Sequence, residues 1–188
     1  MPKSVIADLQ NSALVHLTFE DIFINGEAYT LKITGVKDLS GNAINNGLVT
    51  FSFYIPQQYD IVIDEIMADP TPEVGLPNNE WIELKNNSLF SINLKGWRLS
   101  DLTGTSGPMA DFVLQSDSFV IVCAASALPN LSSFGKTISV TNFPSLDNAG
   151  DLISIADANG KMIHAVQYSS DWYPNELKKG GRLVFGND

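Results

Sequence analysis

Apolar and polar residues alternate along most of the chain, and this alternation predicts β-strands. In residues 28–36 (AYTLKITGV), Tyr29, Leu31 and Ile33 occupy every second position, with polar or charged residues at most positions between them. Residues 48–55 (LVTFSFYI) repeat the alternation. No long stretch carries the helical period. We therefore expect an all-β fold.

Strand-like runs follow one another at short intervals from residue 59 onward. The expected strands cover residues 60–67, 80–86, 97–100, 111–114, 118–124, 137–140, 151–156 and 161–168. The last two are joined by residues 157–160 (DANG), whose Asn-Gly pair favours a tight hairpin. This spacing is typical of a β-sandwich or barrel. One helical turn is expected within residues 127–134, where Pro129 limits its length.

A polar break at Pro56-Gln57-Gln58 predicts a domain boundary. The expected domains are residues 1–57 and residues 58–188. The first portion offers a few strands only, which is marginal for independent stability. Its strand edges would stay unpaired unless covered. We therefore expect it to pack on the second domain or to form a homodimer through this edge.

Two resemblances give these portions a family. Residues 29–44 (YTLKITGVKDLSGNAI) resemble the C-terminal part of a bacterial immunoglobulin-like domain, so residues 1–57 are interpreted as a small β remnant of one. The second portion contains the motifs EWIEL before Lys85-Asn86, INLKGWRLSD at 92–101, LDNAGDLISIADANGKMIHAVQY at 146–168 and DWYPNELKKGGRLVF at 171–185. In this order, the motifs resemble those of the lamin tail domain found in secreted bacterial proteins. His164 stands where the family frequently has Asp.

The lamin-tail resemblance implies an Ig-like β-sandwich and an extracytoplasmic setting, secreted or at the cell surface. Bacterial members often occur beside Ig-like domains, nucleases or other hydrolases. The N-terminus (MPKSVIADLQNS) lacks the apolar core of a signal peptide, so we expect any export signal to lie outside this sequence. No apolar run is long enough to span a membrane.

The net charge of the chain indicates which classes of partner to expect. The formal net charge is −10. Residues 1–57 carry three basic and five acidic residues, whereas residues 58–188 carry eight and sixteen. Such an acidic surface repels phosphate backbones. We therefore expect a protein or cell-surface partner and not nucleic acid.

Acidic residues gather between Asp60 and Glu83, around a loop rich in proline. Carboxylates and loop carbonyls are the ligands that Ca²⁺ prefers. The candidate metal ligands are Glu65, Asp69, Glu80 and Glu83. The alternative is that these acids are solvated or cap loop N–H groups. No cofactor is expected apart from this possible Ca²⁺.

Aromatic residues offer a second candidate binding surface. Trp81 falls on the strand face opposite Ile82 and Leu84, so it is expected to be exposed. Trp172 and Tyr173 precede Pro174 in an expected loop. These three residues are the candidate binding platform, with covering of the sandwich as the alternative role. Trp97, in an alternating strand, is expected in the core.

Residues for catalysis do not assemble in the sequence. The two histidines, His16 and His164, fall in different expected domains, and the single cysteine, Cys123, sits in an apolar strand and allows no intrachain disulfide. The sequence has no serine-hydrolase, phosphate-loop or zinc-ligand motif. We therefore expect a non-catalytic interaction or structural module of an exported bacterial protein. The alternatives are a calcium-dependent binding module and an accessory domain of a secreted nuclease or hydrolase.

Overall fold

A computed structural model of the chain describes residues 1–38, 40–45, 47–172 and 183–184. The chain divides into two compact units, residues 1–55 and residues 56–188, called here the N-terminal unit and the C-terminal unit. The division lies two residues before the boundary expected from the polar break. Each unit is described by itself.

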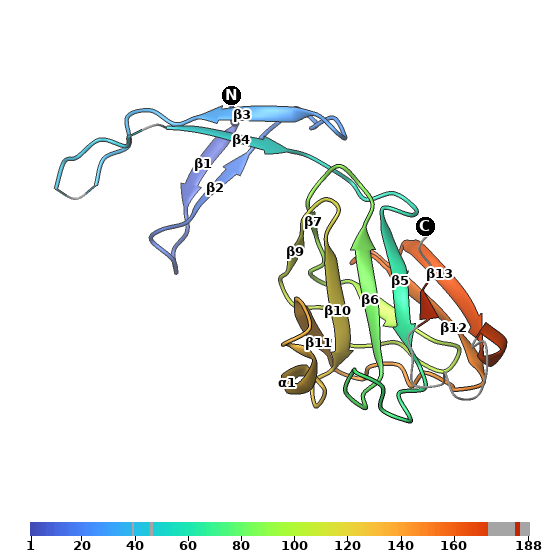
Figure 1. The fold of residues 1–188 in the computed structure, drawn as a ribbon. Coiled ribbons are helices and arrows are strands. Elements are labelled where there is room, and N and C mark those ends of the chain that lie inside the picture. Colours follow the sequence, from blue (N-terminus) through green and yellow to red (C-terminus); the bar gives the residue numbers. More distant parts are fainter. Residues whose placement is uncertain (39, 46, 173–182, 185–188) are drawn as a thin grey trace. The chain divides into compact units, whose positions relative to one another are not determined.

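The N-terminal unit consists of two antiparallel hairpins (Figure 1). Strand β1 (Ser4–Ala7) pairs with β2 (Val15–Thr18), and β3 (Ala28–Lys32) pairs with β4 (Leu48–Ser52). Each pair is a separate two-stranded sheet. The observed β3 and β4 are shorter than the alternation predicted, and the sequence did not single out β1 and β2.

The C-terminal unit is built from a five-stranded sheet and a three-stranded sheet, with a small pair of strands beside them (Figure 1). The five-stranded sheet has the order β11 (Thr137–Val140), β10 (Phe119–Ala124), β6 (Trp81–Asn86), β5 (Ile61–Met67) and β14 (Leu183–Val184). The three-stranded sheet has the order β13 (Met162–Ser169), β12 (Gly150–Ala156) and β8 (Arg98–Ser100). The pair is β7 (Ile92–Asn93) with β9 (Val113–Leu114). All eight strands predicted from residue 60 onward are present.

Alternation along the strands of the C-terminal unit gives each sheet a buried face. On β6, Ile82 and Leu84 are fully buried, and on β12 the same is true of Ile153 and Ile155. Burying such side chains stabilises the fold by about 1.5–3 kcal/mol each. Trp97 is 3% exposed, which confirms its predicted place in the core.

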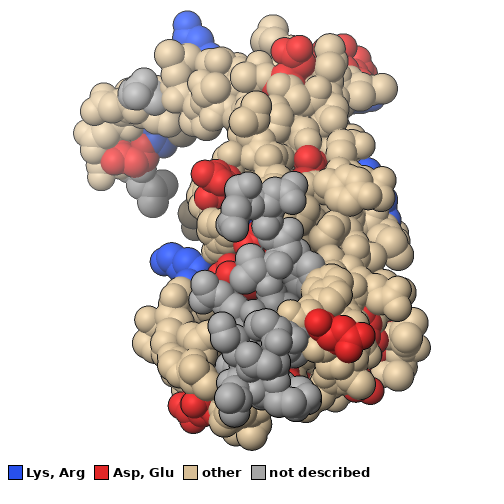
Figure 2. All heavy atoms as spheres, turned by 45° about the vertical axis from the view of Figure 1, so that its right-hand side comes forward, with Lys and Arg blue, Asp and Glu red and all other residues tan. Residues whose placement is uncertain are grey.

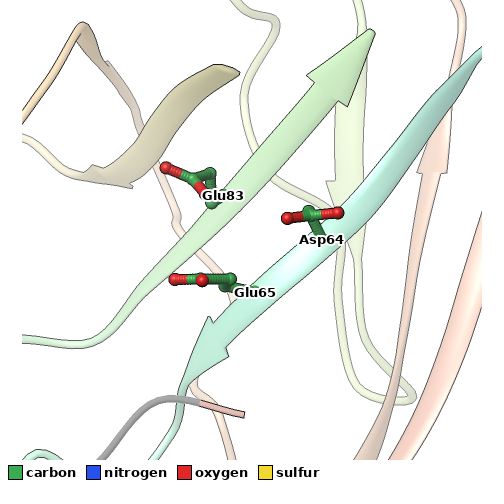
Figure 3. A group of neighbouring side chains, drawn as sticks. All are labelled: Asp64, Glu65 and Glu83. Atoms are coloured by element: carbon green, nitrogen blue, oxygen red, sulfur yellow. The ribbon is translucent and has the colours of Figure 1, made fainter. Parts of the chain in front are cut away.

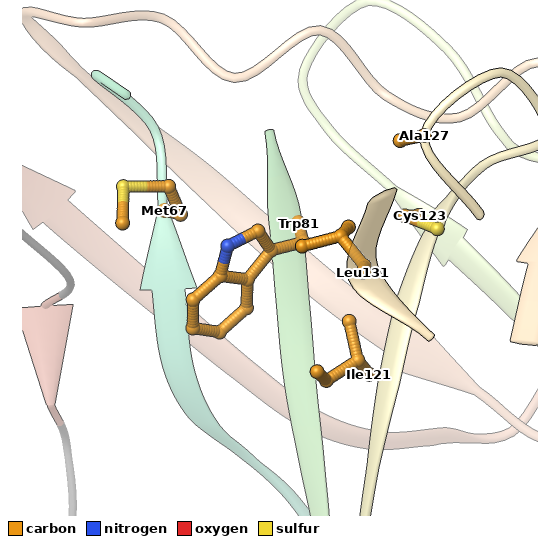
Figure 4. Close-up of a cluster of buried hydrophobic side chains, with 6 residues drawn as sticks. All are labelled: Met67, Trp81, Ile121, Cys123, Ala127 and Leu131. Carbon is orange, nitrogen blue, oxygen red and sulfur yellow. The ribbon is translucent and has the colours of Figure 1, made fainter. Parts of the chain in front are cut away.

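A second apolar cluster covers the other face of the five-stranded sheet (Figure 4). It contains Met67, Trp81, Ile121, Cys123, Ala127 and Leu131. Leu131 belongs to the helical turn α1 (Leu128–Leu131), which lies within the segment where a single turn was predicted. Burial raises the pKa of the Cys123 thiol to about 11, so this cysteine is a core residue and a poor nucleophile.

Trp81 corrects one expectation. It lies on the face opposite Ile82, as the alternation indicated, but it is 3% exposed and belongs to the second cluster. The alternation cannot show that α1 and the partly buried Leu76 pack over this face. Its indole Nε1 has no hydrogen-bond partner among the described residues.

Buried polar groups fix the loops of the sandwich. Asn86 is fully buried, and its Nδ2 donates to the carbonyls of Phe90 and Leu114 at 2.8 and 2.9 Å. Its Oδ1 accepts from the amide and the hydroxyl of Ser88. The β12–β13 hairpin turns at Asp157–Gly160, as the Asn-Gly pair predicted.

Among the described residues, no helix has the length and apolar character needed to cross a bilayer.

Candidate functional site

Three acidic side chains come together on the five-stranded sheet (Figure 3). Asp64 and Glu65 come from β5, and Glu83 comes from the neighbouring β6. The pairing has a bulge between Ile63 and Glu65, so Asp64 is the extra residue while Glu65 lies directly opposite Glu83. One carboxylate oxygen of each residue lies within 4.8 Å of the other two, and all three residues are partly buried. We call Asp64, Glu65 and Glu83 the acidic group.

The acidic group has the donor chemistry of a divalent-cation site. Like charges directly opposite on neighbouring strands repel each other. A hard cation such as Ca²⁺ takes roughly six to eight oxygen ligands, and carboxylates are common among them. Three carboxylates could supply part of such a shell, with water or carbonyl oxygens completing it. Exposed and half-buried acids also occur together without any ion, so the geometry permits a cation and does not require one.

Glu80 contributes to a different feature, a hollow of about 600 Å³. Three more acids line this hollow: Asp101, Asp147 and Asp151. The backbone N–H of Leu146 donates to Glu80 Oε2 at 3.2 Å. Burial raises the pKa of Glu80 above its ordinary value, and the Leu146 bond acts in the opposite direction. The hollow is therefore acidic, and the partly buried carboxyl group of Glu80 holds its proton more tightly than a solvated one.

The four predicted metal ligands thus fall in different places. Glu65 and Glu83 come together, whereas Glu80 lines the hollow. Asp69 follows β5, and the described residues place it in neither set. The structure adds Asp64, which the sequence analysis did not select because a bulge cannot be read from alternation. The predicted metal site remains a prediction.

The predicted aromatic platform is divided as well. Trp172 lies in the 3₁₀ turn η1 (Ser170–Trp172) and is 48% exposed. Tyr173 lies outside the described residues. Trp81 is buried. Within the described part of the chain, Trp172 is therefore the one member of the predicted platform that is exposed to a partner.

An apolar surface of the N-terminal unit was not selected from the sequence. Five rings lie close together, with neighbouring centroids 4.8–5.8 Å apart: Phe19, Phe23, Tyr29, Phe51 and Phe53. We call these residues the aromatic cluster. Tyr29 also accepts a hydrogen bond from the Ile24 amide at 2.7 Å. Phe51 remains 36% exposed.

The aromatic cluster does not form a closed core. In the N-terminal unit, leaving aside residues 39 and 46, no residue reaches the buried class. Val5, Ile6, Val15 and Val49 are each about half exposed or more. A two-stranded hairpin is marginally stable alone in water, and stability normally needs further strands or a packed layer. This unit therefore presents apolar surface that another polypeptide could cover.

Charged side chains are spread over the surface (Figure 2), and the two histidines lie among different partners. In Figure 2, acidic side chains are scattered over the described surface, and Lys and Arg side chains are few. His16 forms an ion pair with Asp8 at 2.8 Å when it is protonated, and the hydrogen bond from His16 lowers the pKa of Asp8. His164 is half-buried, and its Nδ1 accepts a hydrogen bond from the Ile63 amide at 3.0 Å.

Comparison with known proteins agrees with this architecture. A family model described as Lamin Tail Domain matches residues 56–170, which is more than half of the chain. The match covers β5 through β13 and the acidic group. No curated protein matches the sequence. The Ig-like sandwich of the C-terminal unit agrees with this family match. The chain belongs to the lamin tail domain family.

Proposed function

We propose that this chain is a non-catalytic interaction module of an exported or cell-surface bacterial protein, and that its N-terminal unit binds protein. The aromatic cluster carries this proposal, because it gathers five rings in a unit whose described residues include none that is buried. Apolar surface left open in this way is typical of interaction sites. The lamin-tail membership supports an Ig-like structural role. The motifs shared with secreted bacterial proteins support the exported setting.

A second copy of the chain is the partner that charge favours. Strands β1 to β4 contain only Lys32 and His16 as basic residues, and no acid. Two copies that meet through these strands would bring little like charge together, whereas the C-terminal units carry most of the net −10. The edges of the two hairpins, β1–β2 and β3–β4, can also pair with strands of another copy.

Sedimentation velocity of the intact chain over a range of concentrations tests this partner. We expect reversible association, and we expect Val49→Lys to shift the population to monomers. Val49 is 49% exposed, so the lysine can be solvated in the free chain. The matched control is Leu102→Lys, at an exposed position of the C-terminal unit, which should associate like the unchanged chain. A chain that stays monomeric at every concentration would contradict the homodimer.

The non-catalytic role has its own test. The intact chain should turn over none of a panel of phosphodiester, glycoside and ester substrates. Turnover that disappears when one carboxylate of the acidic group is changed would overturn the proposal and would favour the accessory role beside a secreted nuclease or hydrolase.

A calcium-dependent binding module is the second candidate, and the acidic group is the observation that favours it. A ligand that binds the folded chain alone raises its melting temperature. If this function holds, millimolar Ca²⁺ raises the melting temperature of the chain, and Glu83→Gln removes the rise. The control is Asp171→Asn, at an exposed acid outside the group, which should keep it. An unchanged melting temperature in Ca²⁺ would count against this candidate.

A further inference from the structure

Strand β5 lies beside β13 (Figure 1). Two backbone amides, one just before β5 and one within it, donate hydrogen bonds to β13. The N–H of Tyr59 donates to the carbonyl of Ile163 at 3.0 Å. The N–H of Ile63 donates to Nδ1 of the His164 ring, also at 3.0 Å. We call these four residues the β5–β13 seam. The seam joins strands of the two large sheets.

At this edge of β5, a histidine side chain, and not the backbone of a neighbouring strand, accepts the hydrogen bond from the Ile63 amide. Further along β5, the partner is β14, which pairs with Glu65 and Ile66. At Ile63 the acceptor is instead the side chain of His164. Ile63 is 1% exposed, so an N–H left without this acceptor could not reach water unless the chain moved.

The direction of the bond fixes the protonation state of His164. A backbone N–H can only donate, so Nδ1 must be the unprotonated nitrogen and Nε2 must carry the hydrogen. Adding a proton puts a hydrogen on Nδ1. Two donors would then face each other at 3.0 Å, and the bond from Ile63 would be lost.

We propose that neutral His164 holds the β5–β13 seam closed and that protonation of His164 opens it. Mild acid would then loosen the join between the two sheets while the pairing within each sheet persists. Burial lowers the pKa of His164 below its ordinary value of 6.5. Stability from the neutral ring is therefore complete above pH 6.5 and declines as the pH falls through this value toward the lowered pKa.

Several titratable groups lie on the elements around the seam, and two of the charged ones hydrogen-bond to groups other than His164. The ring of Tyr59 meets that of His164 edge-on, with centroids 5.7 Å apart. Lys161, just before β13, donates to the carbonyl of Pro56 at 2.8 Å. Asp157, after β12, accepts from the amides of Asn159 and Lys161.

Further charged residues on these strands are Asp64 and Glu65 on β5 and Asp151 on β12; Asp60 precedes β5, and its carboxylate accepts from the Gln57 amide. In the described ranges, no carboxylate or ammonium group makes a hydrogen bond with the imidazole of His164. The bond to Ile63 is therefore the contact that the proton changes.

Amide exchange measured by NMR on the intact chain tests the proposal. Protection factors correct for the intrinsic effect of pH, so they isolate the opening of the seam. We expect the protection of the Ile63 amide to fall by about tenfold or more between about pH 7.5 and about pH 5. The amide of Ile82, in the middle of the same sheet, should lose much less. The fall should begin near pH 6.5 and level off as the His164 ring, followed by its nitrogen shifts, becomes fully protonated.

Two variants complete the test. In His164→Asn, the side-chain oxygen can accept from Ile63 at every pH, so the pH dependence should disappear. His16→Asn removes the other histidine and should leave the pH dependence of Ile63 unchanged. The proposal is overturned if Ile63 protection does not change with pH, or if the dependence persists in His164→Asn. A loss of protection that continues once the His164 ring is fully protonated would overturn it as well, even if the Asn variant failed to fold.

Discussion

The N-terminal and C-terminal units use the same alternation of residues and reach different outcomes. Ile82 and Leu84 in β6 and Ile153 and Ile155 in β12 are fully buried, because a second layer packs on that face of each sheet. In β4, every residue is exposed, although Val49 and Phe51 alternate with polar residues in the same way. Alternation therefore specifies which side chains share a face. Burial depends on whether the chain supplies a layer to cover that face.

The largest effect should come from truncating matched leucines in the two units. Leu84→Ala removes a fully buried side chain and should destabilise the C-terminal unit by about 2–5 kcal/mol. Leu31→Ala, in β3 of the N-terminal unit, should change the same transition by less than about 0.5 kcal/mol. All three tryptophans belong to the C-terminal unit, so denaturant unfolding followed by tryptophan fluorescence reports on that unit. Equal losses in the two variants would contradict the comparison.

A smaller effect should follow from removing a buried polar side chain. Asn86→Leu keeps a similar volume but removes the side-chain donor to the carbonyls of Phe90 and Leu114 and the acceptor of the Ser88 amide. We expect a loss of about 3 kcal/mol in the free energy of unfolding. Asn93→Ala is the control, because Asn93 is exposed and its bond to Asp111 lies at the surface. When both variants are unfolded in urea, Asn93→Ala should lower the free energy of unfolding by less than about 1 kcal/mol.

The smallest expected change in stability comes from removing the charge of Glu80. A carboxyl group with a raised pKa binds more protons in the folded state than in the unfolded state. Ionisation of Glu80 therefore lowers the stability of the fold. The loss occurs as the pH rises from 4.5, the ordinary pKa of this side chain, through the raised pKa of the folded state. Glu80→Gln should gain less than about 1 kcal/mol at neutral pH, since water screens a half-buried group. The gain should vanish near pH 4. Thermal melts at both pH values would check this, with exposed Glu73→Gln as the control; a gain that is larger at acid pH would contradict it.

Most of the C-terminal fold could be predicted because its signals are local. The turn at Asn159-Gly160 and the alternation in β12 and β13 specify a hairpin within one short stretch. The order of strands in the sheets could not be derived from alternation, since it depends on contacts between distant residues. Strand β7 escaped notice because two residues, Ile92 and Asn93, are too few to show a period.

The candidate site was only partly predictable, for a related reason. Glu65 and Glu83 lie directly opposite each other because of the strand register, and the extra residue Asp64 joins them through a bulge. Register and bulges come from pairing between strands and leave no mark on either strand alone. Trp81 was assigned to the correct face, but the burial of that face depends on α1, about fifty residues away in sequence.

Amide exchange of the intact chain at low and high protein concentration tests the central claim most directly. The account predicts that amides of β5, β6 and β10 are strongly protected at every concentration. Those of β1 to β4 should exchange at least about a hundredfold faster in dilute solution, as expected for marginal hairpins. Their protection should rise with concentration as a second copy covers the aromatic cluster. Strong, concentration-independent protection throughout residues 1–55 would contradict the claim that this unit is completed by a partner.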